Sequence, residues 1–225
     1  EKCIFYVLIL FEKCIFVHVK CLEKCCDMLY RKIDSYIEDH LRSDSDKILL
    51  LDGARQIGKS YIIRTVGKRV YKNYVEINFA EDKEGEKIFE NIHKKEDFYL
   101  TLGMVAGQKL STYEDTLVFL DEIQEYPQYL TMLKFLREDR RYHFIASGSL
   151  LGVTLNVTTS IPVGSVIVKQ MFQLDFEEFL IANGVGSDAI ASLRDKFEKK
   201  ESLSSEQHNK MIELFRRYLL VGGLP

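Results

Sequence analysis

The stretch LLLDGARQIGKS, residues 49–60, decides the fold of this chain. Its first residues, Leu49 to Asp52, are typical of a buried strand, and Gly53 then opens a loop with the spacing Gly-x-x-x-x-Gly-Lys-Ser. The glycines allow backbone N–H groups to turn inward around a phosphate, and a helix that begins after the loop directs the positive end of its dipole at the same anion. Because an apolar strand precedes the loop and a helical pattern follows it, we predict a phosphate-binding loop rather than a chance glycine turn.

We expect the nucleotide-binding residues to be those of the loop and of the first helical turn. They are Gly53, Ala54, Arg55, Gln56, Ile57, Gly58, Lys59, Ser60 and Tyr61. Lys59 should reach the β- and γ-phosphates and so take part in catalysis, and the Ser60 hydroxyl should bind Mg²⁺. The loop by itself leaves the reaction open, because ATPases, GTPases, nucleoside kinases and proteins that only sense nucleotide share it.

Strand and helix patterns alternate along the middle of the chain. Apolar runs predict strands at residues 47–52, 74–80, 116–122 and 142–149, and helical patterns occur at residues 29–41, 60–70, 98–110 and 128–138. A charged segment at residues 81–98 is typical of a solvated helix. This alternation predicts an α/β fold with a parallel sheet covered by helices on both faces.

The third predicted strand, TLVFLDE, ends in two carboxylates, Asp121 and Glu122. Ligands of open parallel sheets bind beyond the carboxyl ends of the strands, so this pair should lie beside the phosphate loop. We expect Asp121 to hold Mg²⁺, and Glu122 to be catalytic by orienting and polarising the attacking water. An isolated Asp-Glu pair is often only a solvated turn, but its place one βα unit after the second strand favours hydrolysis.

The fourth predicted strand ends in Ser147-Gly148-Ser149. A hydroxyl at this tip can act as a sensor that bonds the γ-phosphate or the attacking water, although an ordinary Ser-Gly turn remains an alternative for each serine. Charge neutralisation in the transition state usually needs an arginine. Arg55 in the loop and a cluster at residues 137–141 are available, but the cluster is more typical of a cationic helix C-terminus.

Composition and charge exclude some classes of function. Lys and Arg total 31 against 34 Asp and Glu, which gives a net charge of −3, so the basic surface typical of nucleic-acid binding is not indicated. All five cysteines lie within the first 26 residues, and a body without cysteine is typical of a reducing compartment. We therefore expect a cytoplasmic protein. A nucleic-acid partner is not supported by these residues and stays open only through a C-terminal domain outside this chain.

The N-terminal segment differs from the rest because EKC recurs at residues 1, 12 and 23. An 11-residue period could belong to a right-handed helical supercoil, to a membrane or export signal, or to a short DNA repeat translated upstream of the true start. The first apolar run has eight residues, too short to span a bilayer, and it lacks a cleavage site. We favour the third interpretation for residues 1–27, with a native hairpin or helix as the alternative, and expect no membrane association.

The pattern changes again after residue 149. Residues 160–184 predict a strand and then a short helix with Asp175 as its N-cap, and two further helices are predicted near residues 188–200 and 206–220. The chain then stops at VGGLP, which is a turn signal. We expect a nucleotide-binding core over residues 28–170 and a helical region over residues 171–225 that leads to a C-terminal domain outside this chain.

Six motifs together resemble one family. They are GARQIGKS, FLDEIQEYP, IASGSLLG, IPVGSV, LDFEEFL and YLLVGGLP. In order and spacing they resemble the prokaryotic AAA-like P-loop ATPases of the AAA+ superfamily that carry a C-terminal domain of unknown function. The resemblance covers residues 28–225. It implies Walker A at residues 53–60, Walker B at Asp121 and Glu122, a sensor within residues 147–149, adenine as the base and, by analogy, homo-oligomers that share arginines.

The leading prediction is an Mg²⁺-dependent ATPase whose hydrolysis of ATP drives a C-terminal effector domain. A nucleotide-gated binding or switch module with negligible turnover is the alternative. A nucleoside or small-molecule kinase would also have the phosphate loop, but we find no arginine-rich lid in the sequence.

Overall fold

The structure is a computed structural model that describes residues 29–149 and 164–224. All elements named below belong to the unit that begins at Arg31. The expectation for residues 1–27 lies outside the described residues.

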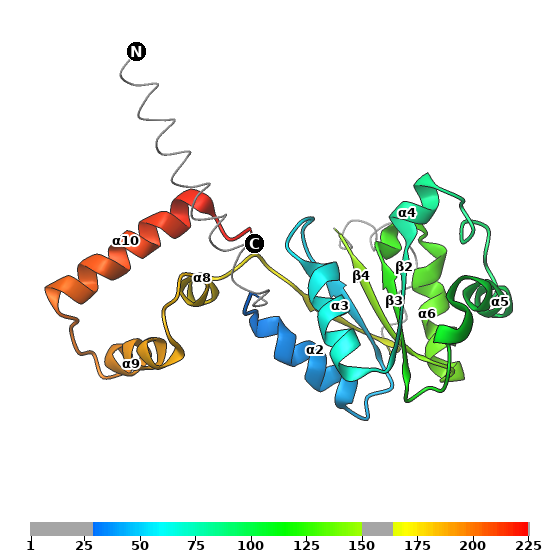
Figure 1. Cartoon of the computed structure of the whole chain (residues 1–225), viewed down its shortest axis with the longest axis horizontal. Coiled ribbons are helices and arrows are strands. Elements are labelled where there is room, and N and C mark those ends of the chain that lie inside the picture. The colour runs from blue at the N-terminus through cyan, green and yellow to red at the C-terminus, as the bar shows by residue number, and fades with distance from the viewer. Residues whose placement is uncertain (1–28, 150–163, 225) are drawn as a thin grey trace, which may run out of the picture. The chain divides into compact units, whose positions relative to one another are not determined.

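Five parallel strands form one sheet with the order β2-β3-β4-β1-β5 (Figure 1). The strands are β1 (Ile48–Asp52), β2 (Asn73–Asn78), β3 (Thr116–Asp121), β4 (His143–Gly148) and β5 (Val166–Gln170). The α/β fold with a parallel sheet, predicted from the alternation of strands and helices, is confirmed. The fourth strand in sequence lies in the middle of the sheet, between β3 and β1.

Helices cover both faces of the sheet, with α2 and α3 on one face and α5 and α6 on the other (Figure 1). Their bounds are α2 (Lys32–Arg42), α3 (Lys59–Val70), α4 (Phe79–Glu84), α5 (Lys95–Ala106) and α6 (Gln128–Asp139), with single 3₁₀ turns η1 (Gly107–Lys109) and η2 (Ile123–Glu125). β1 and β3 are buried along their whole length, as expected for strands with helices on both faces.

The prediction for residues 74–98 is wrong in two respects. The second strand ends at Asn78, whose side chain accepts hydrogen bonds from the N–H groups of Ala80 and Glu81 and so caps α4. The solvated helix is also shorter than predicted, because α4 ends at Gly85 and an irregular segment follows. Two apolar residues of that segment, Phe89 and Ile92, are buried in the core.

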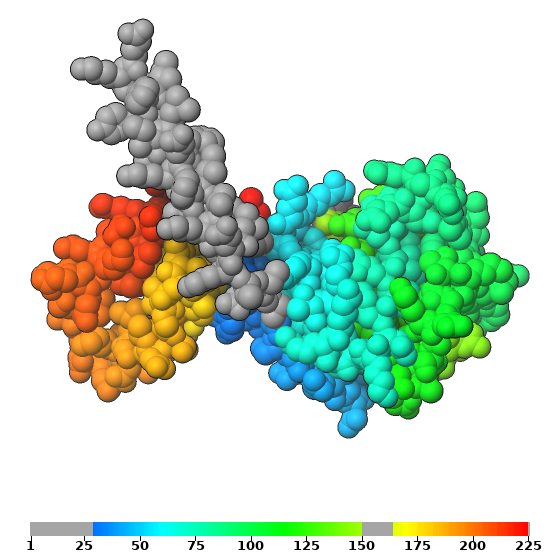
Figure 2. Space-filling model, viewed as in Figure 1, coloured from blue at the N-terminus to red at the C-terminus, as the bar shows by residue number. Residues whose placement is uncertain are grey.

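The C-terminal part of the described chain is helical, as predicted, with α8 (Phe176–Ala182), α9 (Ser187–Glu198) and α10 (Ser205–Val221). Asp175 is the N-cap of α8 and forms a capping box with Glu178. Gly222 ends α10 with φ +72°. The turn after α8 and the two helices α9 and α10 line a hollow that Figure 2 shows between the yellow and red parts of the surface. No helix among the described residues is both long and apolar enough to cross a membrane.

Candidate nucleotide-binding site

The strand order brings the predicted motifs to one edge of the sheet. β4 pairs with β1 on one side and with β3 on the other, with Leu51 opposite Ser147 and Leu120 opposite Ala146. The carboxyl ends of these three strands therefore lie side by side. The phosphate loop, the Asp121–Glu122 pair and the Ser147–Ser149 tip follow these ends, so the three motifs converge beyond one sheet edge.

The phosphate loop is shaped for an anion. Gly58 is the N-cap of α3 and has φ +90°, a conformation that glycine adopts without steric cost. No side chain caps this helix, so the N–H groups of its first turn have no side-chain acceptor. These donors and the positive end of the helix dipole fit a phosphate group.

Lys59 lies within the curve of the loop and is 5% exposed. Its Nζ donates hydrogen bonds to the carbonyl oxygens of Gly53, at 3.0 Å, and Ala54, at 2.7 Å, and to Ser149 Oγ, at 3.0 Å. Burial lowers the pKa of Lys59, and the nearby carboxylates of Glu122, Asp121 and Asp52 oppose that shift. The ammonium group is thus held where the loop and β4 meet.

Asp121 is the acceptor at the centre of the site. Its carboxylate accepts hydrogen bonds from the hydroxyls of Ser147 and Ser60 and, at 3.0 Å, from the N–H of Glu122. Burial raises the pKa of Asp121, whereas the bonds from the two serines lower it. The Ser60 hydroxyl and the Asp121 carboxylate, which touch, are the hard oxygen donors that suit Mg²⁺.

Glu122 is held in an unusual backbone conformation, with φ +52° and ψ +47°. A residue other than glycine rarely adopts this left-handed region, and such residues are often found at functional sites. The Gln124 amide donates to the Glu122 carboxylate, and its oxygen accepts from the Ser149 N–H at 3.0 Å. A cleft of about 700 Å³ lined by Glu122, Arg55 and Gln56 gives solvent access to this carboxylate.

The structure places the remaining predicted loop residues in different surroundings. Ile57 is buried, whereas Ala54, Arg55 and Gln56 are exposed, and Arg55 and Gln56 line the cleft beside Glu122. Tyr61 is 51% exposed on α3. Its backbone N–H belongs to the first turn of α3, which no side chain caps.

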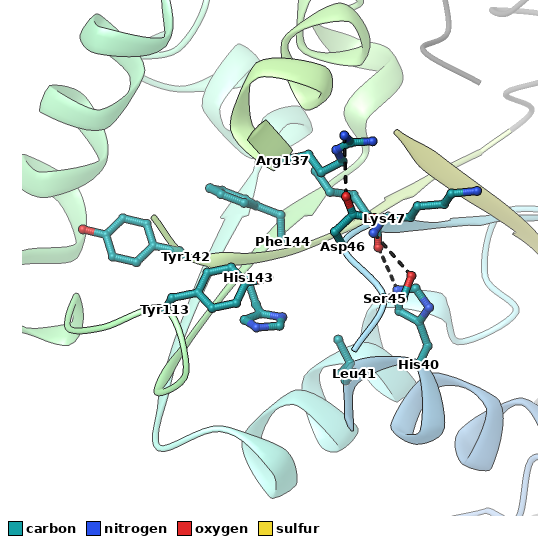
Figure 3. A pocket seen from close by; sticks show the side chains of 11 residues that line it. His40, Leu41, Ser45, Asp46, Lys47, Tyr113, Arg137, Tyr142, His143 and Phe144 are labelled. Atoms are coloured by element: carbon teal, nitrogen blue, oxygen red, sulfur yellow. Dashed lines mark hydrogen bonds and ion pairs between the residues drawn. The ribbon is translucent and has the colours of Figure 1, made fainter. Parts of the chain in front are cut away.

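The arginine cluster lies at the opposite edge of the sheet. Arg137 pairs with Asp46 at 3.5 Å and donates to the Gly164 carbonyl at 3.0 Å, beside a small pocket at the amino ends of β1 and β4 (Figure 3). Arg140 ends α6, and the Arg141 guanidinium lies over the ring of Tyr99. The three arginines therefore do not join the phosphate loop, which agrees with the helix C-terminus interpretation.

Sequence reasoning missed several polar residues of the site. Gln124 belongs to the family signature DEIQ, but its link between Glu122 and Ser149 is visible only in the structure. Asp52, at the end of β1, accepts from Gln170 Nε2 at 2.5 Å. Among residues 29–149 and 164–224 no group of three or more His, Cys, Asp or Glu could hold a metal ion. A metal with few protein ligands, completed by substrate phosphates, is the arrangement that fits Mg²⁺.

A family model described as an AAA domain matches residues 45–180, which is more than half of the chain. The chain belongs to the AAA-domain family. The AAA domain is a P-loop ATPase module, so at the level of the family this is a nucleotide-binding ATPase. The matched range contains both the phosphate loop and the Asp121–Glu122 pair. A search of curated proteins gives no match to the sequence.

Three solved structures are weakly similar to this chain. The Walker-type ATPase PABY2304 of Pyrococcus abyssi shares 15% identity over 88% of this chain and 65% of its own, with a TM-score of 0.48. The ORC1 protein of Aeropyrum pernix in complex with DNA shares 15% over 68% and 47%, with a TM-score of 0.44. PCH-2 of C. elegans shares 16% over 70% and 50%, with a TM-score of 0.39. The chain thus spans about half to two thirds of the length of these proteins.

Proposed function

We propose that this protein is an Mg²⁺-dependent ATPase in which Lys59, Asp121 and Glu122 form the catalytic centre. The observation that carries the proposal is the convergence of the loop lysine and the two carboxylates at the carboxyl edge of β1, β4 and β3. Family membership supports ATP as the nucleotide. Hydrolysis by this particular chain is the step that the proposal adds.

Binding would use the loop residues 53–60 and the first turn of α3. Their N–H groups would donate to the β-phosphate, and Lys59 would exchange its bonds to loop carbonyls for the β- and γ-phosphate oxygens. Ser60 and Asp121 would hold Mg²⁺, which supplies positive charge against the charge that develops on the phosphates. Burial lowers the pKa of Lys59, and an anionic ligand beside its ammonium group would favour the charged form.

Glu122 would orient and polarise the attacking water. Its carboxylate is reached from the cleft described above, and Gln124 restricts its rotation by a direct hydrogen bond. Ser149 contacts both Lys59 and Gln124, which makes it the serine best placed to sense the γ-phosphate. Ser147 bonds Asp121 and would instead orient the metal-binding carboxylate.

We further propose that residues 28–170 form the ATPase core, and that residues 171–225 connect it to a C-terminal effector domain. A homo-oligomer is part of this proposal. The described arginines 137, 140 and 141 lie at the far edge of the sheet, so Arg55, which lines the cleft with Glu122, or an arginine of a neighbouring copy would supply the positive charge. A cytoplasmic location remains a prediction from the composition, which also gives no support for a nucleic-acid partner.

The test is phosphate release by the intact protein and by Glu122→Gln. We expect turnover to fall by roughly 100-fold or more, because the amide cannot accept the proton of the attacking water, while ATP affinity is retained. Glu125→Gln is the matched control, since Glu125 lines the same cleft but forms an ion pair with Lys83 at 3.1 Å. Equal turnover in Glu122→Gln and in the wild type would reject the role of Glu122.

A nucleotide-gated switch with negligible turnover is the second candidate. The observation in its favour is the distance of the arginine cluster from the phosphate loop, at the opposite edge of the sheet. Tight ATP binding without phosphate release at any protein concentration would favour the switch over the ATPase.

A further inference from the structure

A buried arginine is hydrogen-bonded to the backbone of the phosphate loop. Arg31, the N-cap residue of α2, is only 7% exposed. Its Nη1 donates to the Ile57 carbonyl at 3.0 Å, and its Nη2 donates to the Phe172 carbonyl at 2.6 Å. The guanidinium therefore ties the residue before Gly58 to the segment that follows β5.

The third side of the guanidinium faces Glu178, which is 5% exposed. The Arg31 Nε and the Glu178 Oε2 are 3.4 Å apart. The same carboxylate accepts from the N–H of Lys32 at 2.7 Å and from the N–H of Asp175 at 3.0 Å. Glu178 thus fixes the beginning of α8 to the beginning of α2, with Arg31 between them.

A second connection runs parallel to the first through the segment at residues 171–174. The Met171 N–H donates to the Asp52 carbonyl at 2.7 Å, immediately before the phosphate loop. At its other end the Leu174 N–H donates to the Gly223 carbonyl at 2.7 Å, and Tyr218 Oη donates to the Leu174 carbonyl at 2.8 Å. The segment therefore contacts both the phosphate loop and the end of α10.

A buried ion pair needs an explanation beyond stability. Desolvation of the two charges offsets much of their attraction, and well-packed apolar residues of similar size are often as stabilising. Arg31, however, uses its planar fork to hold two loop carbonyls at fixed positions, which neither an apolar residue nor a lysine can do. Its contacts are therefore suited to positioning backbone.

We propose that Arg31 is a positioning residue that sets the shape of the phosphate loop and, through Glu178, transmits occupancy of the loop to α8 and α10. The proposal rests on the proposed nucleotide binding. A phosphate that draws the N–H groups of Gly58 and Lys59 inward also moves the Ile57 carbonyl, to which Arg31 is bonded. The same guanidinium then shifts relative to Glu178 and the Phe172 carbonyl. The phosphate loop and the beginning of α8 would therefore respond together.

The test uses two conservative variants and two matched controls. Arg31→Lys keeps the charge but cannot bridge both carbonyls, and Glu178→Gln keeps the shape but removes the charge. Arg42→Lys is the control on α2, because Arg42 forms an exposed pair with Glu38. Glu177→Gln is the control on α8, because Glu177 pairs with Lys32 and Arg194 at the surface. Circular dichroism shows whether each variant is folded.

Two measurements separate positioning from simple stability. The first is ATP affinity together with KM and kcat. The second is hydrogen–deuterium exchange of residues 176–182 and 205–221 with and without a non-hydrolysable ATP analogue. We expect the wild type and both controls to show slower exchange in these helices on binding. Arg31→Lys should bind about tenfold more weakly, which corresponds to the loss of one charge-assisted hydrogen bond, and should lose the response of the helices. Glu178→Gln should keep most of the affinity and lose the response.

The outcomes distinguish this proposal from the proposed function. Wild-type protein that binds no ATP rejects the proposed function. Wild-type protein that binds ATP, with helices that respond equally in Glu178→Gln, overturns the linkage even if Arg31→Lys fails to fold. Unchanged affinity in folded Arg31→Lys overturns the role of Arg31 in the loop.

Discussion

Gly53 is the residue at which the phosphate loop and the segment after β5 come closest. A Cβ at this position would lie 2.4 Å from the Met171 carbonyl oxygen and 2.7 Å from the Ile57 Cδ1. The first of these neighbours is backbone that is itself hydrogen-bonded to Asp52. The glycine is therefore required by contact as well as by its place in the phosphate-loop pattern.

We predict that Gly53→Ala lowers the free energy of unfolding by about 1–3 kcal/mol, the usual cost of an overpacked site, and weakens ATP binding. Urea unfolding and nucleotide titration measure the two effects. Gly103→Ala is the control, because a Cβ there meets nothing within 4 Å and alanine is the better helix former. Equal stability of the two variants would contradict the predicted clash.

The sequence predicts the roles of some residues of the site and not those of others. The predicted roles of Lys59, Asp121 and Glu122 follow from spacing, because strand ends of a parallel sheet meet at one edge. Arg31 and Glu178 carry no such signal, since a charge on an amphipathic helix is usually solvated. Only the three-dimensional contact shows that they are buried and paired.

At the level of elements, the amino edge of the sheet holds a half-buried histidine. The His143 ring, at the start of β4, contacts the Tyr113 ring with centroids 3.9 Å apart and planes tilted by 38°, and its centroid lies 5.3 Å from that of Tyr71 (Figure 3 shows it beside Tyr113). Burial lowers the pKa of His143 to about 4, opposed by Glu114 and reinforced by His40 and Arg140. The neutral form is thus favoured in the folded state.

We predict that the protein loses stability as the pH falls from about 6.5 to about 4. In this window the unfolded chain binds a proton at His143, at its ordinary pKa near 6.5, that the folded chain does not bind until about pH 4. The full shift corresponds to roughly 3 kcal/mol. Urea unfolding at pH 7 and pH 5 should show a smaller pH effect in His143→Phe, and an identical effect in the wild type and the variant would refute the assignment to His143.

Element boundaries were predictable where apolar periodicity was strong. Three elements begin and end within a residue of their predicted positions. They are β1, which precedes the phosphate loop, β3, which ends at Asp121, and α6. The boundaries of the segment after β2 could not be predicted in this way. The high charge of residues 81–98 indicates a solvated helix, yet Phe89 and Ile92 pack into the core from an irregular segment. Asn78 also caps α4, so residues 79 and 80, predicted as the end of the strand, are the first residues of this helix.

At the scale of the whole molecule, bound nucleotide should stabilise the fold. A ligand that binds only the folded state raises the free energy of unfolding by about 2.7 kcal/mol at a hundredfold excess over its Kd. We predict a rise of Tm with ATP and Mg²⁺ that decreases when Mg²⁺ is removed by a chelator and is lost in Lys59→Met. Thermal melts with ADP, GTP and no nucleotide measure the effect.

The control for that experiment is Lys68→Met. Lys68 lies on α3, where its Nζ is 5.6 Å from the centre of the Tyr74 ring, away from the loop. This variant should keep the response to ATP. Loss of the response in both lysine variants would indicate damage to α3 rather than to the phosphate contact.

The arrangement of the whole sheet could be predicted only in part. Alternating strands and helices indicate a parallel sheet, and the motif order indicates one ligand-binding edge. The strand order β2-β3-β4-β1-β5 depends on pairings between strands far apart in sequence, which local patterns do not encode. The division at residues 170 and 171 remains a prediction.

The central position of β4 has a consequence for synthesis of the protein. Translation produces the phosphate loop and the Asp121–Glu122 pair before β4, yet the strand that holds them side by side is β4 itself. A nascent chain released or stalled before residue 143 therefore contains both nucleotide motifs but has no continuous sheet to bring them together. We therefore expect a nascent chain to bind ATP only after β4 has been made, because β4 lies between the two strands that precede the nucleotide motifs.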